Sequence, residues 1–320
     1  MNIGIDMMGG DFAPLEAVKG IRLYLDDTNV NGPATLFCIG QEDKVIPLLE
    51  QYDLLSHPNV KVIPAPEVIG YNEHPTKALK EKQQSSIAIG FYLLATGKIE
   101  AFMSAGNTGA MLVGAMYSIK AIEGVQRPTI ATLLPKLDGS TGVLLDVGLN
   151  ADCKPEHLNQ FAILGSLYAG NILGIQQPRV ALLNVGEEEG KGNLLAQATY
   201  PLLKENTHIH FTGNVEGRDV FLDKADVVVC DGFTGNIVLK MTESLYDIAV
   251  SRKLENDEYL SRLHYENYGG TPVLGVSKPV IIGHGISNAK AFKNMVHLGE
   301  RMIETQLCDK IKENFQAIPK

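Results

Sequence analysis

The stretch around residue 230 constrains the fold of this chain more than any other part of its sequence. Residues 227–229 are three valines in a row, which is typical of a strand covered on both faces in a parallel sheet. Gly232 and Gly235 follow in a short turn, and glycine permits close approaches that other residues resist. Backbone N–H groups that stay free where a helix begins can bind an anion. The stretch therefore predicts a buried strand, a tight turn and a helix start suited to an anion.

Four other predicted strands run into similar turns, rich in glycine, asparagine and acidic residues. These turns cover residues 105–109, 147–150, 185–193 and 283–288. In open α/β sheets, ligands bind in the crevice beyond the carboxyl ends of the strands. We therefore expect the polar side chains of all these turns to converge on one site.

The order of the predicted elements indicates an α/β fold. Helices are predicted at residues 14–26, 41–51, 84–97, 155–173 and 193–204, with a C-terminal helix starting near Ser287. Strands are predicted at residues 2–6, 35–39, 59–63, 101–104, 129–134, 142–146, 180–184, 208–211, 227–230 and 280–282. Because strands and helices alternate, helices should cover both faces of a mostly parallel mixed sheet, which gives three α/β/α layers.

The whole chain, residues 1–320, is predicted to form a single catalytic α/β domain. It is long enough to bury a sizeable core, and no low-complexity linker or repeat of fixed length interrupts it. Residues 241–268 are charged and aromatic and lack a strand pattern. We expect them to form a helical projection from this domain.

Composition and charge exclude several classes of protein. The formal net charge is −9, whereas non-specific binding to nucleic acid needs lysine and arginine to neutralise phosphates. The four cysteines lie far apart and lack a CxxC spacing, so neither zinc nor a disulfide framework is expected. The uncharged residues 101–119 include polar residues and glycines, and they predict a strand, a loop and a buried helix rather than a membrane span. The chain opens on a predicted strand instead of a signal peptide, so we expect a cytoplasmic protein.

Gly106, Asn107, Thr108 and Gly109 form the strongest candidate for a phosphate-binding turn. Free backbone amides and a threonine hydroxyl can hold an oxyanion, and the helix dipole adds about 0.3–1 kcal/mol. The alternative is that these residues only cap the helix that follows. No Walker lysine is present, so nucleotide hydrolysis is not expected.

Charged side chains in three other turns are further candidates. Lys191 lies between two glycines, directly after a glutamate run, and its side chain could reach a phosphate or a developing oxyanion. Arg218 could bind phosphate, although an ion pair with an acidic residue is the favoured interpretation. His284 lies between two glycines at a strand end, where it could handle a proton or simply make a structural hydrogen bond.

The sequence offers little support for other reaction classes. Cys230 could accept an acyl group, but its interpretation as a small buried hydrophobe is favoured. The turn with Asp6, Gly9 and Gly10 is not a GxGxxG motif, and no acidic residue ends the second strand, so a nicotinamide cofactor is weakly supported. No GxSxG motif, no Ser-His-Asp set and no metal-binding spacing is found. We expect neither a metal nor a cofactor.

Seven motifs together resemble one protein family almost end to end. They occupy residues 6–11, 104–110, 145–148, 183–188, 213–219, 230–236 and 268–272. These motifs resemble the PlsX family, the phosphate acyltransferases of bacterial phospholipid synthesis. The resemblance implies a fold like that of the isocitrate and isopropylmalate dehydrogenases and of phosphotransacetylase.

The resemblance also implies a reaction and a set of partners. Acyl-[acyl carrier protein] and inorganic phosphate would give acyl phosphate and free carrier protein. The enzyme would be a cytosolic homodimer with peripheral contact at the inner face of the cell membrane. Its product would pass to a membrane glycerol-3-phosphate acyltransferase on the way to phosphatidic acid.

Roles for individual residues follow as hypotheses. Phosphate at neutral pH is already substantially dianionic, so positioning and charge stabilisation should suffice. We expect the residues from Gly106 to Gly109, with Lys191, to hold phosphate. The thioester oxygen would be held by Asn214, Asn236 or the backbone amides of residues 232–236, and His284 would orient phosphate or protonate the leaving thiolate. The remaining expected substrate-binding residues are Asp6, Gly9, Gly10, Asn184, Glu187, Asp231, Gly232, Thr234 and Gly235.

The acyl chain needs an apolar groove, because each buried methylene contributes about 0.8 kcal/mol. The candidates for this groove are Leu112, Met116, Leu239 and Leu245. Two alternatives to the acyltransferase remain: a dehydrogenase that uses a nicotinamide cofactor, and a non-catalytic adaptor for lipid synthesis. The many polar turns at strand ends argue against the adaptor, which needs no convergent polar pocket.

Overall fold

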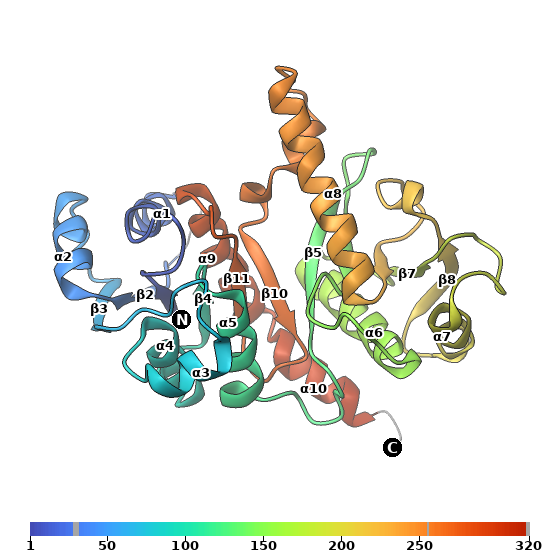
Figure 1. The fold of residues 1–320 in the computed structure, drawn as a ribbon, viewed down its shortest axis with the longest axis horizontal. Coiled ribbons are helices and arrows are strands. Elements are labelled where there is room, and N and C mark those ends of the chain that lie inside the picture. The colour runs from blue at the N-terminus through green and yellow to red at the C-terminus, as the bar shows by residue number, and fades with distance from the viewer. Residues whose placement is uncertain (28–31, 255, 318–320) are drawn as a thin grey trace. The chain divides into compact units, whose positions relative to one another are not determined.

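The computed structural model describes residues 1–27, 32–254 and 256–317 of the chain (Figure 1). The chain divides into two compact units. Unit 1 contains residues 1–121 and 266–308, and unit 2 contains residues 122–265 and 309–320. Each unit contains parallel strands with helices packed around them.

In unit 1, the strands lie in the order β3, β2, β1, β4, β11 and β10. Their bounds are Val60–Pro64 (β3), Thr35–Gly40 (β2), Asn2–Asp6 (β1), Ala101–Ser104 (β4), Val280–Gly283 (β11) and Gly270–Leu274 (β10). Neighbouring strands are parallel, except that β10 runs antiparallel to β11. As a result, the carboxyl ends of β1, β4 and β11 lie at one edge.

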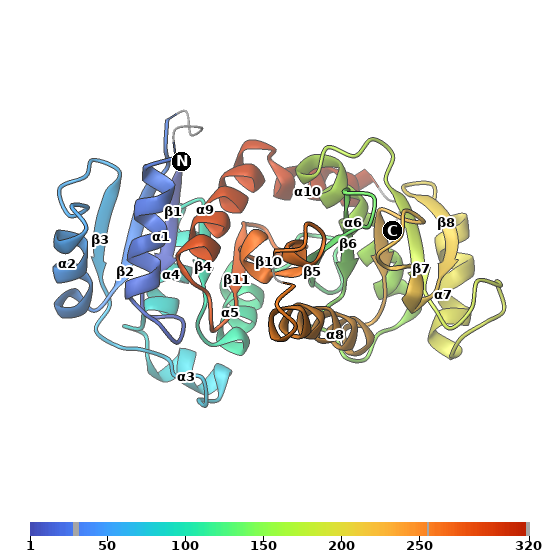
Figure 2. The ribbon, with the colours of Figure 1, turned by 90° about the horizontal axis from the view of Figure 1, so that it is seen from above.

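Helices cover both faces of the strands in unit 1 (Figures 1 and 2). One face carries α1 (Leu15–Leu25), α2 (Glu42–Gln51) and α9 (Ala289–Glu304). The other carries α3 (Pro75–Glu81), α4 (Ser86–Ala95) and α5 (Thr108–Gly114), which continues into the π-helical turn η1 (Ala115–Ile119). The apolar period predicted for the C-terminal helix is confirmed, because its apolar residues from Ala291 to Met302 are buried.

In unit 2, the strands lie in the order β5, β6, β9, β7 and β8. Their bounds are Thr129–Pro135 (β5), Thr141–Leu145 (β6), Val227–Val229 (β9), Arg179–Leu183 (β7) and His210–Val215 (β8). β5 runs antiparallel to β6, and the other neighbours are parallel. The three valines of β9 are fully buried, as the sequence predicts.

The helices of unit 2 also lie on two faces (Figure 2). α6 (Pro155–Ile172) and α7 (Leu194–Glu205) pack together, while α8 (Gly232–Ser251) runs along the other face. The short turns η2 (Gly217–Asp219), η3 (Leu260–Leu263) and η4 (Tyr265–Asn267) and the C-terminal helix α10 (Leu307–Ala317) complete the elements. The predicted α/β class, with a mostly parallel mixed sheet and flanking helices, is confirmed.

Two elements lie where the sequence predicts none. α3 has only seven residues and begins at Pro75, so it lacks a long apolar period. β10 begins within a Gly-Gly-Thr-Pro segment whose composition is typical of a turn. The segment 241–268 contains the second half of α8, followed by the turns η3 and η4. None of the helices in the described residues is both long enough and apolar enough to cross a bilayer.

Candidate functional site

At the carboxyl edge of unit 1, the buried Asp6 anchors a chain of hydrogen bonds that joins β1 to β4. The Gly106 N–H donates to Ser104 Oγ at 2.9 Å, and the Ser104 hydroxyl donates to Asp6 Oδ2 at 2.6 Å. Asp6 Oδ1 accepts the Met8 N–H at 2.9 Å. Burial raises the pKa of Asp6, while hydrogen bonds from Ser104, Ser86 and the backbone partly offset that rise. The buried Asp6 carboxylate therefore links the ends of β1 and β4 through hydrogen bonds.

The predicted glycine pair allows the first turn to pack against its neighbours. A Cβ on Gly9 would lie 2.5 Å from the Gly106 nitrogen and 2.6 Å from Asp6 Oδ2. Gly10 has a φ of 109°, and the Asp11 N–H donates to the Gly285 carbonyl at 2.7 Å. The pair thus brings the turns after β1, β4 and β11 into contact.

The Asn107 side chain holds its own turn together. Its Oδ1 accepts the Ala110 N–H at 2.9 Å, which caps α5, and its Nδ2 donates to the Gly70 carbonyl at 2.9 Å. Within residues 1–27, 32–254 and 256–317, no acceptor binds the N–H groups of Thr108 and Gly109. These two amides, rather than the Asn107 side chain, are available to an anion.

β11 places His284 and a buried hydroxyl at the same edge. His284 is half-buried, and its carbonyl accepts the Ser287 N–H at 2.9 Å. Ser287 Oγ is buried and finds no hydrogen-bond partner in the described part of the chain. Unit 1 therefore presents two free amides and a histidine at the carboxyl edge of its parallel strands.

In unit 2, two asparagines fix the loop that follows β7. Asn184 Nδ2 donates to the Lys191 carbonyl at 3.1 Å, and Asn214 Nδ2 donates to the Glu188 carbonyl at 3.0 Å. Gly192 has a φ of 97°, and a Cβ there would lie 2.2 Å from Asn184 Oδ1. The loop therefore requires glycine at this position. One of the two N–H donors of the Asn214 amide bonds to this loop, and its predicted bond to a thioester oxygen stays a prediction.

The Lys191 side chain is exposed, and the loop that carries it is held in place by the hydrogen bonds from Asn184 and Asn214. No carboxylate of the described residues forms an ion pair with its Nζ. Two neighbouring acidic residues pair with other lysines. Glu187 pairs with Lys224 at 2.6 Å, and Glu189 pairs with Lys204 at 2.9 Å. Lys191 is thus available to an anionic ligand, whereas the Glu187 carboxylate already has a cation.

The start of α8 is capped tightly. The Thr234 N–H and hydroxyl donate to the two carboxylate oxygens of Asp231 at 2.9 and 2.8 Å. The Gly232 N–H donates to the Asn150 carbonyl at 2.7 Å. Among the N–H groups of residues 232–236, only that of Phe233 lacks an acceptor among the residues described. Most of the predicted anion-binding capacity here is therefore used by the protein itself.

Gly235 allows α8 to pack against the turn after β6. A Cβ on Gly235 would lie 1.9 Å from the Asp146 carbonyl oxygen, which no side chain could tolerate. Asn236 lies one residue further, and its Nδ2 would be 3.4 Å from a Cβ on Gly148. The glycine is thus needed for close packing, and it places the Asn236 amide beside the same turn.

Asp146, for which sequence analysis predicts no role, organises this turn. Its carboxylate is buried and accepts the Asn150 N–H at 2.6 Å, the Asn150 side-chain amide at 2.8 Å and the Ile130 N–H at 3.2 Å. The only signal in the sequence was its place at a strand end within a recognised motif. Asp146 supports the surface on which α8 begins.

Two minor candidates match the interpretations that the sequence favoured. Cys230 is buried, and burial raises the pKa of its thiol well above the usual range, so it stays protonated at neutral pH. Arg218 forms an ion pair with Glu216 at 2.8 Å. Neither residue has the environment of a nucleophile or of a dedicated phosphate ligand.

A pocket of about 290 Å³ opens at the carboxyl edge of unit 2. It combines three predicted site residues, Asn184, Asp231 and Thr234, with a wall of aliphatic side chains. The sequence did not predict this wall, which contains Leu158, Leu182, Leu195, Ala196 and Val238. These residues come from four elements, α6, β7, α7 and α8, and each has the pattern of an ordinary core residue.

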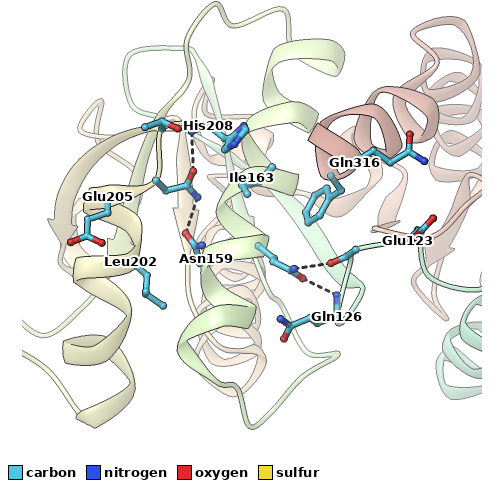
Figure 3. A pocket seen from close by; sticks show the side chains of 13 residues that line it. Glu123, Gln126, Asn159, Ile163, Leu202, Glu205, His208 and Gln316 are labelled. Carbon is cyan, nitrogen blue, oxygen red and sulfur yellow. Dashed lines mark hydrogen bonds between the residues drawn. The ribbon is translucent and has the colours of Figure 1, made fainter. Parts of the chain in front are cut away.

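A larger pocket, about 700 Å³, contains none of the predicted site residues (Figure 3). It lies beside residues 205–208, which precede β8, and is therefore at the opposite edge of the strands. Asn159, Gln160 and Asn206 bond across its walls or to the backbone. No group of histidine, cysteine and acidic residues in the described chain could hold a metal ion.

Comparisons with known proteins find relatives along almost the whole chain. A family model described as "Fatty acid synthesis protein" matches residues 1–310. The phosphate acyltransferase of Dictyoglomus turgidum is 40% identical over 336 residues, covering 99% of this chain and 98% of that protein. The phosphate acyltransferase of Aquifex aeolicus is 40% identical over 337 residues, with the same shares of the two chains.

Solved structures share the fold at lower identity. A phosphotransacetylase from Streptococcus pyogenes has a TM-score of 0.66 at 18% identity and covers 95% of this chain and 94% of its own. A 4-hydroxythreonine-4-phosphate dehydrogenase from Klebsiella pneumoniae has a TM-score of 0.55 at 13% identity, covering 94% of this chain and 97% of its own. These likenesses show that the chain has an α/β fold shared with a phosphotransacetylase and a dehydrogenase. Within that fold class, the chain belongs to the PlsX family of phosphate acyltransferases.

Proposed function

We propose that this protein transfers the acyl group of acyl-[acyl carrier protein] to inorganic phosphate, in the synthesis of phosphatidic acid. The observation that carries the proposal is identity of about 40% with phosphate acyltransferases along almost the whole chain. A phosphate oxygen attacks the thioester carbonyl carbon, the carbon–sulfur bond breaks, and the carrier leaves as a thiolate that takes up a proton. The products are acyl phosphate and free carrier protein, and no metal or cofactor takes part.

Free donors at the two carboxyl edges support the roles of individual residues. In unit 1, the Thr108 and Gly109 N–H groups have no acceptor among the described residues, and we assign anion binding at that edge to them. In unit 2, the Lys191 ammonium has no carboxylate partner among the described residues, and we assign it separately as a phosphate ligand. The Asn236 amide and the Phe233 N–H are assigned to the thioester oxygen, which becomes negative as the phosphate adds.

The test is a direct assay of the purified protein with acyl-[acyl carrier protein] and phosphate. Acyl phosphate, trapped as a hydroxamate, should form in a one-to-one ratio with free carrier thiol. Without phosphate, neither product should accumulate. Release of thiol without acyl phosphate would mean a thioesterase, and the absence of both products would reject the proposed function.

A second copy of the chain is the proposed partner of α8. Phe233, Ile237, Met241, Leu245 and Ile248 form an exposed apolar stripe with a spacing of three or four residues, all on one side of the helix. An exposed apolar stripe of this kind on a helix marks an interaction surface. Two such stripes related by a two-fold axis would cover each other, which gives a homodimer.

We expect Met241→Glu to convert the dimer into a monomer. The substitution places a charge in the centre of the stripe, where it would lose its hydration in the dimer. The mass in solution, measured by sedimentation, should fall from twice that of one chain to that of one chain. Lys240→Glu introduces the same side chain on the adjacent surface of α8 and should leave the dimer intact. A wild-type protein that sediments as a monomer at all concentrations would reject the dimer.

We further propose that the enzyme works in the cytoplasm, in peripheral contact with the inner face of the membrane. A membrane glycerol-3-phosphate acyltransferase would take up its product there. A long-chain acyl phosphate supports this placement, because each methylene favours an apolar environment by about 0.8 kcal/mol. Co-sedimentation with anionic lipid vesicles tests the contact, and protein that stays entirely in the supernatant would argue against it.

A further inference from the structure

The pocket at the carboxyl edge of unit 2 is apolar within and polar at its rim. It lies between the ends of β7 and β9 and the first turns of α7 and α8. Leu158 and Leu182 are almost fully buried in its wall, and Ala196 and Val238 face them from α7 and α8. No lysine or arginine lines it. The interior therefore suits a hydrocarbon and does not suit a phosphate.

The polar groups at the rim are largely satisfied by the protein. Asn193 Oδ1 accepts the Ala196 N–H at 2.8 Å, and Asp231 accepts both donors of Thr234. The Asn184 amide donates to the loop after β7. A ligand in this pocket would thus gain mainly apolar contacts rather than hydrogen bonds.

The mouth of the pocket is unusually apolar for a protein surface. Val185 is 80% exposed and forms part of the lining, and Leu194, next to two lining residues, is 86% exposed. Large aliphatic side chains with this exposure would shed water if an apolar ligand passed over them. They extend the apolar surface outward from the pocket.

We propose that this pocket holds the acyl chain of the substrate, and that Ala196 and Val238 determine which chain lengths are accepted. The inference rests on the proposed acyl transfer and names the place of its apolar substrate group. A volume of 290 Å³ corresponds to roughly ten groups of about 30 Å³ each, the volume share of a water molecule. The pocket therefore takes part of a long chain, and the remainder lies over Val185 and Leu194.

Two other pockets of unit 2 fit this role less well. One of about 320 Å³ is also apolar and is lined by Leu245, Leu260 and Leu263. It also includes Leu137, which follows β5 at the amino edge of β6, away from the carboxyl edge where the thioester is expected. The pocket of about 700 Å³ mixes apolar side chains such as Ile163 and Leu202 with amide and acidic ones such as Asn159 and Glu205 (Figure 3). Of these three pockets, the one between β7 and β9 is apolar and contains Asn184, Asp231 and Thr234, whereas the other apolar pocket contains the weaker candidates Arg218 and Leu245.

The experiment compares kcat/KM for carrier proteins that carry short, medium and long saturated chains. Ala196→Leu fills the pocket and should shift the ratio of long-chain to short-chain kcat/KM by about tenfold or more toward short chains. Val238→Ala enlarges the pocket and should shift the ratio in the opposite direction. Ala198→Leu makes the same change on the exposed side of α7 and should leave the ratio unchanged.

Each outcome of this comparison decides the inference. If Ala196→Leu does not fold, Val238→Ala decides alone. Unchanged ratios in the folded variants would overturn the inference, and so would an equal rise in KM for all chain lengths, which would place the carrier's prosthetic arm in the pocket. A shifted ratio in Leu260→Phe instead would assign the chain to the other apolar pocket. If the wild-type protein makes no acyl phosphate from any chain, the proposed function itself fails.

Discussion

Replacing Lys191 with alanine is expected to lower kcat/KM for phosphate by about 10²–10³-fold. The loop that carries Lys191 is fixed by Asn184 and Asn214, so the backbone should not change. The loss would come from removing a cation that has no carboxylate partner within the described chain. Initial rates at varied phosphate concentration, with saturating acyl-[acyl carrier protein], measure the effect.

Two companion variants separate charge from position. Lys191→Arg keeps the positive charge and should recover most of the lost activity, although the planar guanidinium differs in shape from an ammonium. Lys204→Ala removes an exposed lysine that pairs with Glu189 of the same loop, and it should stay within about twofold of the wild type. A folded Lys191→Ala enzyme with near-normal kcat/KM, or an equal loss in Lys204→Ala, would remove Lys191 from the site.

The fold could be predicted largely from the sequence because its strands are buried and its helices are amphipathic. The valines of β9 and the apolar period of α9 each match one regular element. These signals are local, since each depends on residues within about two helical turns or one strand. The short helix α3 and the Gly-Pro-containing β10 lack such a period, and they were missed.

The candidate site was less predictable because hydrogen-bond partners are distant in the sequence. The sequence predicts a turn and a helix start at Asn107, and the structure shows both. The sequence does not reveal that the Asn107 side chain bonds to carbonyls of residues 70–73, more than thirty positions away. Asn214 likewise bonds to Glu188. A sequence shows which residues carry a donor, whereas only the structure shows whether that donor is already used.

The apolar pocket was equally hard to predict from the sequence, because it depends on how distant residues pack together. Leu158, Leu182, Ala196 and Val238 each lie on a different element, and each has the pattern expected of a core residue. Their burial could be inferred from periodicity, but the space between them could not. Chain-length preference therefore depends on a property that appears only when α6, α7, α8 and β7 come together.

Replacing Lys136 with methionine is expected to lower the stability of unit 2 by about 3 kcal/mol. Lys136 follows β5 and is only 2% exposed, and its Nζ binds Asp226 at 2.8 Å and Asp223 at 3.0 Å. Methionine has a similar length and no charge, so it would leave the buried Asp226 carboxylate with Arg179 alone. Because Arg179 stays in place, the cost should lie at the low end of the usual range for a broken buried pair.

The same cluster predicts a dependence of stability on pH. Burial alone would raise the pKa of Asp226, but hydrogen bonds from Arg179 and Lys136 outweigh burial and hold that pKa well below its usual range. A carboxyl group with a lowered pKa in the folded state stabilises the protein above its unfolded pKa, about 3.9 for aspartate. This stabilisation should disappear as the pH falls below about 4, and Lys136→Met should weaken that acid-side dependence.

Urea unfolding and hydrogen exchange together measure the effect and its location. The midpoint should fall at neutral pH, and amides of β7 and β9 should exchange faster, whereas those of β1 and β4 in unit 1 should not. Lys204→Met serves as the control, because its ion pair with Glu189 is exposed and screened by solvent, so its loss should leave the midpoint nearly unchanged. If both variants lose the same small amount, the buried cluster contributes no more than a surface pair. The stability of unit 2 would then depend on its apolar core alone.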